Sequence, residues 1–90
     1  LGRYQEAVGS YDKALALKPD YAEAWIDRGV ALGVLGRPQE ALASFDKALT
    51  ISPDDADAWR GRGMALGDLG RSQEAEESSR KADELRKRGT

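Results

Sequence analysis

The chain has 90 residues, of which 33% are charged, and a net charge of −2, so it is one small domain with too little positive charge for a broad nucleic-acid or anionic membrane surface. It contains no histidine and no cysteine, which excludes catalytic triads, thiolate nucleophiles, disulfides and the usual zinc sites. No apolar run approaches the roughly 20 residues that span a bilayer. We therefore expect no enzyme activity, no cofactor, no metal and no membrane partner.

The sequence predicts consecutive helices and no strands. No stretch alternates polar and apolar residues with the period of two that a half-buried strand requires. Helix-forming residues fill the segments between short clusters of glycine, proline and aspartate. The predicted helices span about residues 3–17, 21–35, 38–51, 55–69 and 72–88. We therefore predict an all-α fold.

The ends of these helices follow from residues that start or stop a helix. Asp20 and Asp54 are predicted to cap the second and fourth helices, because a carboxylate accepts hydrogen bonds from the free amides of a first turn. Gly36 and Gly70 follow the same two helices, where a residue in the left-handed conformation is favoured. Pro38 begins the third helix, where its missing N–H costs little.

A similar sequence recurs at an interval of 34 residues. Residues 1–21 match residues 35–55 at 13 of 21 positions. Residues 22–40 match residues 56–74 at 13 of 19 positions. Agreement of this extent at one fixed interval is the signature of a repeat architecture, so the chain consists of about two and a half copies of a two-helix unit.

The repeat divides the chain into three parts of a single domain. They are a half repeat at 1–21 with the second helix only, a full repeat at 22–55 and a final repeat at 56–90. The first residue is Leu1 and not methionine, and the chain begins in the middle of a unit. We therefore expect that it is cut from a longer protein.

Two apolar stripes run along the second helix of each unit, and one of them is lost in the last copy. The first stripe survives in all copies and is predicted to pack within its own unit, because its alanines let two helices approach closely. The second is predicted to pack on the next unit, so its loss makes the last helix a solvating cap. The first stripe is Ala7, Ala14, Leu17, Ala41, Ala48, Ile51, Ala75, Ala82 and Leu85; the second is Tyr4, Val8, Tyr11, Leu15, Pro38, Leu42, Phe45 and Leu49, replaced by Ser72, Glu76, Ser79 and Asp83.

This pattern resembles the tetratricopeptide repeat family over the whole chain. The residues that carry the resemblance are Trp25, Gly29, Leu32, Gly36, Ala41, Phe45, Ala48 and Pro53, most of them repeated as Trp59, Gly63, Leu66, Gly70, Ala75 and Ala82, with Tyr11, Ala14 and Pro19 in the first unit. The chain departs from the family in having Leu32 and Leu66 for a tyrosine and Ser79 for a large aromatic residue. The resemblance implies a right-handed superhelix of antiparallel helix pairs, whose first helices line a concave groove that binds peptides or partner proteins.

The resemblance also implies which residues line that groove. They are Glu23, Ile26, Asp27, Val30, Gly33 and Val34 from one unit, and Asp57, Arg60, Gly61, Met64, Gly67 and Asp68 from the next. Family members that grip a peptide's terminal carboxylate use lysine, asparagine and arginine at such positions, whereas only Arg60 is cationic here. The apolar residues and the acids around them predict instead a partner segment with apolar anchors and some basic residues. Because two first helices make a short groove, the alternative that this segment binds nothing alone stays open.

Self-association is a second hypothesis. The first unit lacks its first helix, so Ala7, Ala14 and Leu17 lack the cover that the repeat supplies elsewhere. Stacks of fewer than about three units are marginal. We therefore predict a homodimer, either a symmetric dimer at this end or a swapped helix. A structural spacer in a longer array is a third alternative, and the absence of cysteine and of a signal sequence favours the cytoplasm.

Two further features resemble binding sites. Trp25 and Trp59 could anchor a partner, but their 34-residue spacing favours structural packing between helices. The segment from Glu74 to Arg88 carries five basic residues, but five acids balance them and no aromatic residue lies among them. We therefore expect no nucleic-acid partner, and we predict a non-catalytic protein–protein interaction module.

Overall fold

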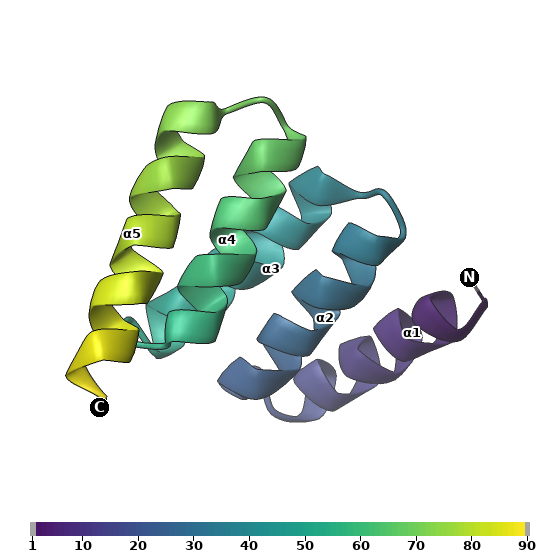
Figure 1. The fold of residues 1–90 in the computed structure, drawn as a ribbon. Helices are drawn as coiled ribbons and strands as arrows, with labels where there is room; N and C mark the ends of the chain where they lie inside the picture. Colours follow the sequence, from purple (N-terminus) through teal and green to yellow (C-terminus); the bar gives the residue numbers. More distant parts are fainter. Residues whose placement is uncertain (1, 90) are drawn as a thin grey trace.

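The computed structural model describes residues 2–89, which form five helices joined by short turns (Figure 1). Leu1 and Thr90, the outer bounds of the predicted repeats, lie outside the described residues. No strand occurs within residues 2–89, and each predicted helix agrees with an observed one to within a residue at either end, so the all-α prediction is confirmed. The helices are α1 (Gly2–Leu17), α2 (Ala22–Val34), α3 (Pro38–Ile51), α4 (Ala56–Asp68) and α5 (Ser72–Arg88).

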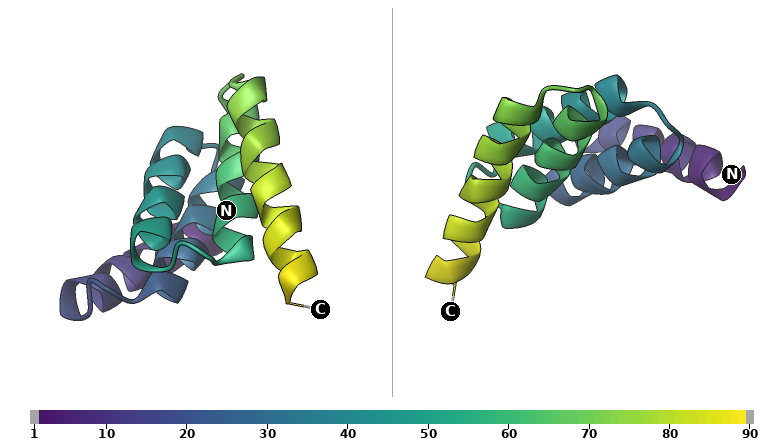
Figure 2. Two further views of the ribbon diagram at one scale, coloured as in Figure 1. Left: turned by 90° about the vertical axis from the view of Figure 1, so that its left-hand side faces the viewer. Right: turned by 45° about the horizontal axis from the view of Figure 1, so that its top comes forward.

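The five helices form one stack that measures 33 × 27 × 19 Å. Each helix packs against the next one along the chain, and α2 also contacts α4 directly. The first helices of the two complete units therefore lie side by side, with α3 behind them (Figure 1), and the right-hand view of Figure 2 shows the stack as an arch. Within residues 2–89, no helix combines the length and the apolar character needed to cross a membrane.

Glycines end α2 and α4 as predicted. Gly36 and Gly70 have φ angles of 74° and 78°, in the left-handed region that glycine adopts without steric cost. Beyond Gly36, the N–H of Arg37 donates to the carbonyl of Leu32 at 2.9 Å, which satisfies one of the free carbonyls at the end of α2. The same bond recurs at the end of α4, so both first helices stop at equivalent positions.

The predicted N-caps are wrong by one residue. Asp55 and not Asp54 caps α4, and its side chain accepts a hydrogen bond of 3.2 Å from the N–H of Ala58. Tyr21 and not Asp20 precedes α2, and its side chain makes no capping bond. In both cases the N–H of the N-cap residue closes the preceding turn, so the predicted aspartate lies inside that turn and cannot cap the helix.

The predicted stripes build the core, with one correction. Ala41 and Ala48 are buried, as expected for the stripe that packs within its unit. Phe45, from the other stripe, is only 3% exposed, but its ring lies against both Gly29 of α2 and Gly61 of α4. The prediction that this stripe packs on the next unit was therefore incomplete, because Phe45 also packs within its own unit.

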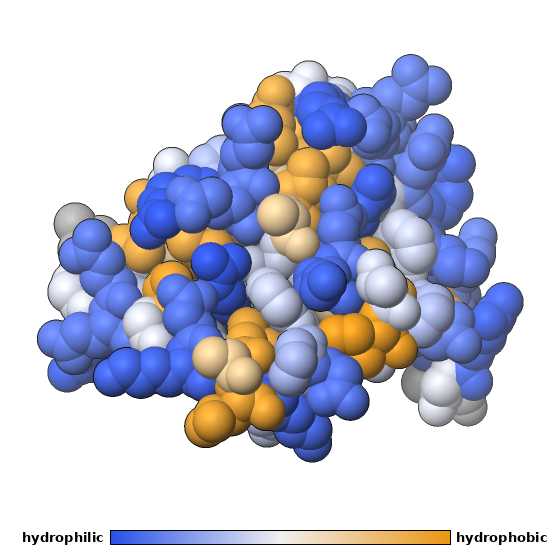
Figure 3. All heavy atoms as spheres, turned by 180° about the vertical axis from the view of Figure 1, so that it is seen from behind, coloured by the Kyte–Doolittle hydropathy of each residue, from blue (hydrophilic) through white to orange (hydrophobic). Residues whose placement is uncertain are grey.

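The second stripe is exposed where it becomes polar. Ser79, at the position of Phe45 in the last copy, is exposed, and so are Glu76 and Asp83. Hydrophilic side chains dominate the molecule's surface over α5, at the right of Figure 3. Leu85, from the surviving stripe, is buried on the inner side of α5. One face of α5 therefore packs on α4 while the other faces water, as predicted.

An arginine of each first helix ties three helices together. The Nε of Arg28 in α2 donates to the carboxylate of Asp12 in α1 at 2.7 Å, and its Nη1 donates to the hydroxyl of Ser44 in α3 at 2.7 Å. Arg62 makes the equivalent bonds 34 residues later, at 2.8 and 2.6 Å. These bonds, which were not predicted from the sequence, fix each first helix to the helices before and after it.

Candidate groove between the first helices

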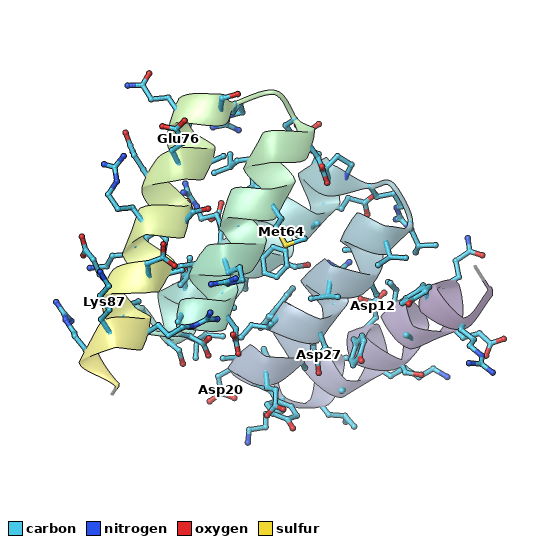
Figure 4. The ribbon with its side chains drawn as sticks, viewed as in Figure 1. Asp12, Asp20, Asp27, Met64, Glu76 and Lys87 are labelled. Atoms are coloured by element: carbon cyan, nitrogen blue, oxygen red, sulfur yellow. The ribbon has the colours of Figure 1, made fainter. Side chains whose placement is uncertain are left out.

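An apolar hollow lies between α2 and α4, and we call it the α2–α4 hollow. Its volume is about 240 Å³. Met64 of α4, which is labelled at the centre of Figure 4, is 68% exposed beside it. The lining residues are Gly29, Val30, Gly33, Val34, Ala41, Phe45, Gly61, Met64, Ala65 and Asp68, so a single carboxylate interrupts an otherwise apolar wall.

Six of the predicted groove residues line this hollow together: Val30, Gly33, Val34, Gly61, Met64 and Asp68. Val30 and Val34 of α2 are 51% and 50% exposed, although both are apolar. They lie four residues apart and therefore point from the same face of the helix. Met64 and Asp68 have the same spacing on α4. The two helices thus present their apolar side chains toward one shared space, from positions that are equivalent in the repeat.

The predicted acids of α2 lie further along the same helix face. Asp27, labelled in Figure 4, precedes Val30 by less than a turn, and Glu23 precedes Asp27 by a further turn. Both carboxylates are exposed. Among residues 2–89 neither of them, nor Asp68, forms an ion pair with a basic side chain. This side of the groove therefore carries uncompensated negative charge next to apolar surface.

Two predicted groove residues form ion pairs with α5. Arg60 pairs with Asp83 of α5 at 3.7 Å, and Asp57 pairs with Arg86 of α5 at 3.9 Å. All four side chains are about half exposed or more, so these ion pairs add little stability. They nevertheless place the groove's predicted cation beside a carboxylate, so Arg60 is poorly placed to bind an acidic partner.

Ile26 contributes less to the groove than its sequence position suggests. Its side chain is half-buried and packs against the core cluster that includes Leu32 and Phe45. The structure places it between the core and the groove, so a polar substitution at Ile26 would disturb the fold as well as the surface. Val30 and Met64 are more exposed, so substitutions at these two residues test binding in the groove with less effect on the fold.

The floor of the hollow was not identified as a site from the sequence. Phe45 was predicted as a packing residue, and its ring forms the floor because two glycines leave room for it. A Cβ at Gly29 would lie 2.7 Å from the ring, and a Cβ at Gly61 would collide with it as well. The sequence did contain a signal of this close packing. Gly61 occupies the position that Asp27 has in the preceding unit, so the two copies differ at this point.

Trp25 and Trp59 do not line the hollow. The Nε1 of Trp25 donates to the carbonyl of Pro19 at 2.9 Å, and that of Trp59 donates to the carbonyl of Pro53 at 2.7 Å. Both tryptophans are half-buried against the turn that precedes their helix. This geometry agrees with the structural interpretation of the two residues.

The residues predicted for self-association lie on α1, at one end of the stack. Ala7 and Ala14 are half-buried, and Leu17 is 89% exposed. Among the described helices, α1 contacts α2 alone, whereas α3 contacts both α2 and α4. The face of α1 that carries these residues therefore has less cover than the equivalent alanines of α3, which are fully buried.

Comparison with known proteins agrees with this architecture. In a search of solved structures, the MamA MSR-1 structure is 32% identical with a TM-score of 0.91, over 98% of this chain and 51% of that one. The MamA AMB-1 structure is 32% identical with a TM-score of 0.89, over 96% and 51%. The Arabidopsis OM64 TPR domain is 30% identical with a TM-score of 0.91, over 93% and 69%. The chain thus spans about half the length of these MamA chains.

The family comparison is more direct. A search of curated proteins finds no match to the sequence. The family model for the tetratricopeptide repeat matches residues 1–56 and again residues 35–88, so its two matches overlap by one helix and extend over most of the chain. Tetratricopeptide repeats are protein-interaction scaffolds in general. The chain belongs to the tetratricopeptide repeat family.

Proposed function

We propose that the chain is a non-catalytic protein–protein interaction module that binds a peptide or a partner protein in the groove between α2 and α4. The observation that carries the proposal is the α2–α4 hollow, whose apolar wall residues Val30, Val34 and Met64 are each half exposed or more. Burial of apolar surface contributes about 25 cal/mol per Å², so a partner segment that covers these side chains gains binding free energy. A contiguous apolar patch with polar residues around it is typical of interaction sites.

A selection from a random peptide library, with the chain as bait, tests this proposal. We expect the selected peptides to shift the NMR signals of Val30, Val34 and Met64. Val30→Asp should abolish their binding without changing the thermal melt, because the side chain is half exposed. Ala43→Asp is the matched control, since Ala43 is an exposed residue of α3 outside the hollow. Peptides that bind equally to the Val30→Asp variant would refute the groove as the binding site.

Self-association through α1 is a second candidate, favoured by the 89% exposure of Leu17 beside half-buried Ala7 and Ala14. Two chains that meet at this face, in a symmetric dimer or by exchange of a helix, would bury these side chains. Light scattering should then give a mass above 9.8 kDa that Leu17→Asp returns to the monomer value. A monomer at all concentrations rules this candidate out. A structural spacer in a longer repeat array, the third candidate, would show neither self-association nor peptide binding.

A further inference from the structure

The charge at the α2–α4 hollow narrows the kind of partner, if the proposed function holds. Among residues 2–89, Asp68 is the only charged residue that lines the hollow, and it is the last residue of α4. A carboxylate at the C-terminal end of a helix is unfavourable, because the helix dipole is negative there. The equivalent residue of α2 is Val34, so the fold does not require an acid at this position. Asp68 therefore destabilises the C-terminal end of its own helix, and no requirement of the fold explains why an acid occupies this position.

The basic residues that follow α2 and α4 in the sequence already have other partners. Arg71, three residues after the last residue of α4, binds Glu74 through two hydrogen bonds of 2.9 and 2.8 Å. Arg37, at the same place after α2, binds Glu40 through bonds of 2.7 and 2.6 Å. Among residues 2–89 no ion pair involves Asp68. Its negative charge is therefore available to a group from outside the chain.

The shape of the hollow suits one large apolar side chain. Its volume of about 240 Å³ lies below the roughly 300–1,000 Å³ of typical small-molecule sites. Phe45 closes the bottom, and Val30 and Met64 form opposite walls. Gly33 leaves the wall of α2 open, because nothing lies within 4 Å of the position its Cβ would take. The backbone of a partner can therefore approach α2 closely while its side chain points toward the Phe45 ring.

We propose that the hollow binds a partner segment that inserts one bulky apolar side chain, such as leucine, methionine or phenylalanine, over Phe45 and pairs a neighbouring lysine or arginine with Asp68. This inference rests on the proposed function of the groove. Charge complementarity carries it, because apolar walls and a single free carboxylate select an apolar anchor with an adjacent cation. The exposed carboxylates of Glu23 and Asp27 on α2 add to the same preference.

The test uses peptides selected from a random library against the complete chain and mapped to the hollow by NMR. We expect their shared pattern to be one large apolar residue with a lysine or arginine close to it. Binding of a fluorescent selected peptide should weaken about two- to fivefold in Asp68→Asn, the size of one exposed ion pair. The same substitution should leave the melting temperature unchanged or raise it, because it removes an acid from a helix C-terminus. Glu77→Gln, a neutralised carboxylate of α5 outside the hollow, should change neither binding nor melting temperature.

A double-mutant cycle isolates the ion pair. Asp68→Asn and a lysine-to-glutamine change in the peptide should weaken binding non-additively, because each removes the same interaction. Additive effects would overturn the pairing with Asp68. Selected peptides that occupy the hollow but carry acidic neighbours would overturn this inference and leave the proposed function intact. A selection that yields no peptide in the hollow would overturn the proposed function itself, and this inference with it.

Discussion

The Nη1 of Arg62 donates a hydrogen bond of 2.6 Å to the hydroxyl of Ser78, and the equivalent bond joins Arg28 to Ser44 at 2.7 Å. Both serines are fully buried, and without these bonds each hydroxyl would be a buried polar group with no hydrogen-bond partner. The bonds hold the first helix of a unit against its second helix. The bond from Arg28 to Ser44 and the bond from Arg62 to Asp46 attach α2 and α4 to the same helix, α3, and so help to set the width of the α2–α4 hollow.

Ser78→Ala should lower the free energy of unfolding by about 1–2 kcal/mol, because it removes a hydrogen bond to a charged donor that is only partly exposed. Urea denaturation measures the change. Ser79→Ala is the matched control, since Ser79 is the exposed neighbour on the same helix and makes no such bond. Equal effects of the two substitutions would show that the bond between Arg62 and Ser78 contributes nothing.

Gly61 and Gly67 of α4 should respond in opposite directions to substitution by alanine. Gly61→Ala should destabilise the chain by about 1–3 kcal/mol, because its Cβ would overlap the Phe45 ring and force repacking. Gly67→Ala should stabilise it by up to about 1 kcal/mol, because nothing lies near the added Cβ and alanine favours a helix. Thermal denaturation of both variants measures the difference. Stabilisation by Gly61→Ala would mean that Phe45 does not depend on the missing side chain.

The fold was predictable because local signals and the repeat agree. Gly36 favours the end of a helix and Pro38 favours the start of one, and the repeat predicts the same helix boundaries in both units. The prediction of the N-caps failed because the position of Asp20 and Asp54 relative to the helix depends on the turn before it. A backbone hydrogen bond closes that turn, and the sequence does not reveal which residues form this bond.

The site was predictable only in part. Exposed positions such as Val30 and Met64 follow from their place in the repeat. The floor of the hollow could not be predicted in this way. Gly29 and Gly61 lie equally far from Phe45 in the sequence, one before it and one after it, and only the packing of three helices brings the three residues together. A buried serine such as Ser44 is likewise invisible in the sequence, since its partner Arg28 lies on another helix.

Acidification should weaken two local ion pairs. The two hydrogen bonds from Arg37 hold the pKa of Glu40 below its usual range, and those from Arg71 do the same for the pKa of Glu74. A carboxylate with a lowered folded-state pKa stabilises the chain above its unfolded-state pKa. That contribution is lost as the pH falls through the lowered folded-state value.

NMR titration of the side-chain carboxyl carbons checks this expectation. Arg37→Gln should return the pKa of Glu40 toward its ordinary value, because the hydrogen bonds from Arg37 are the largest cause of the shift. The pKa of Glu74 should not respond, since its own partner Arg71 is intact. The reciprocal variant, Arg71→Gln, serves as the matched control. A titration midpoint of Glu40 that stays the same in Arg37→Gln contradicts the assignment.

Trp59→Phe separates the structural role of the tryptophans from a role as partner anchors. Phenylalanine keeps an aromatic ring but removes the indole N–H that donates to Pro53 at 2.7 Å, so the free energy of unfolding should fall by roughly 0.5–1.5 kcal/mol. The affinity for a peptide bound in the α2–α4 hollow should stay the same, because Trp59 lines a different surface together with Leu49. Urea denaturation and fluorescence anisotropy measure the two quantities on one sample. An unchanged stability combined with lost peptide binding would instead identify Trp59 as an anchor, and would move the binding surface away from the groove.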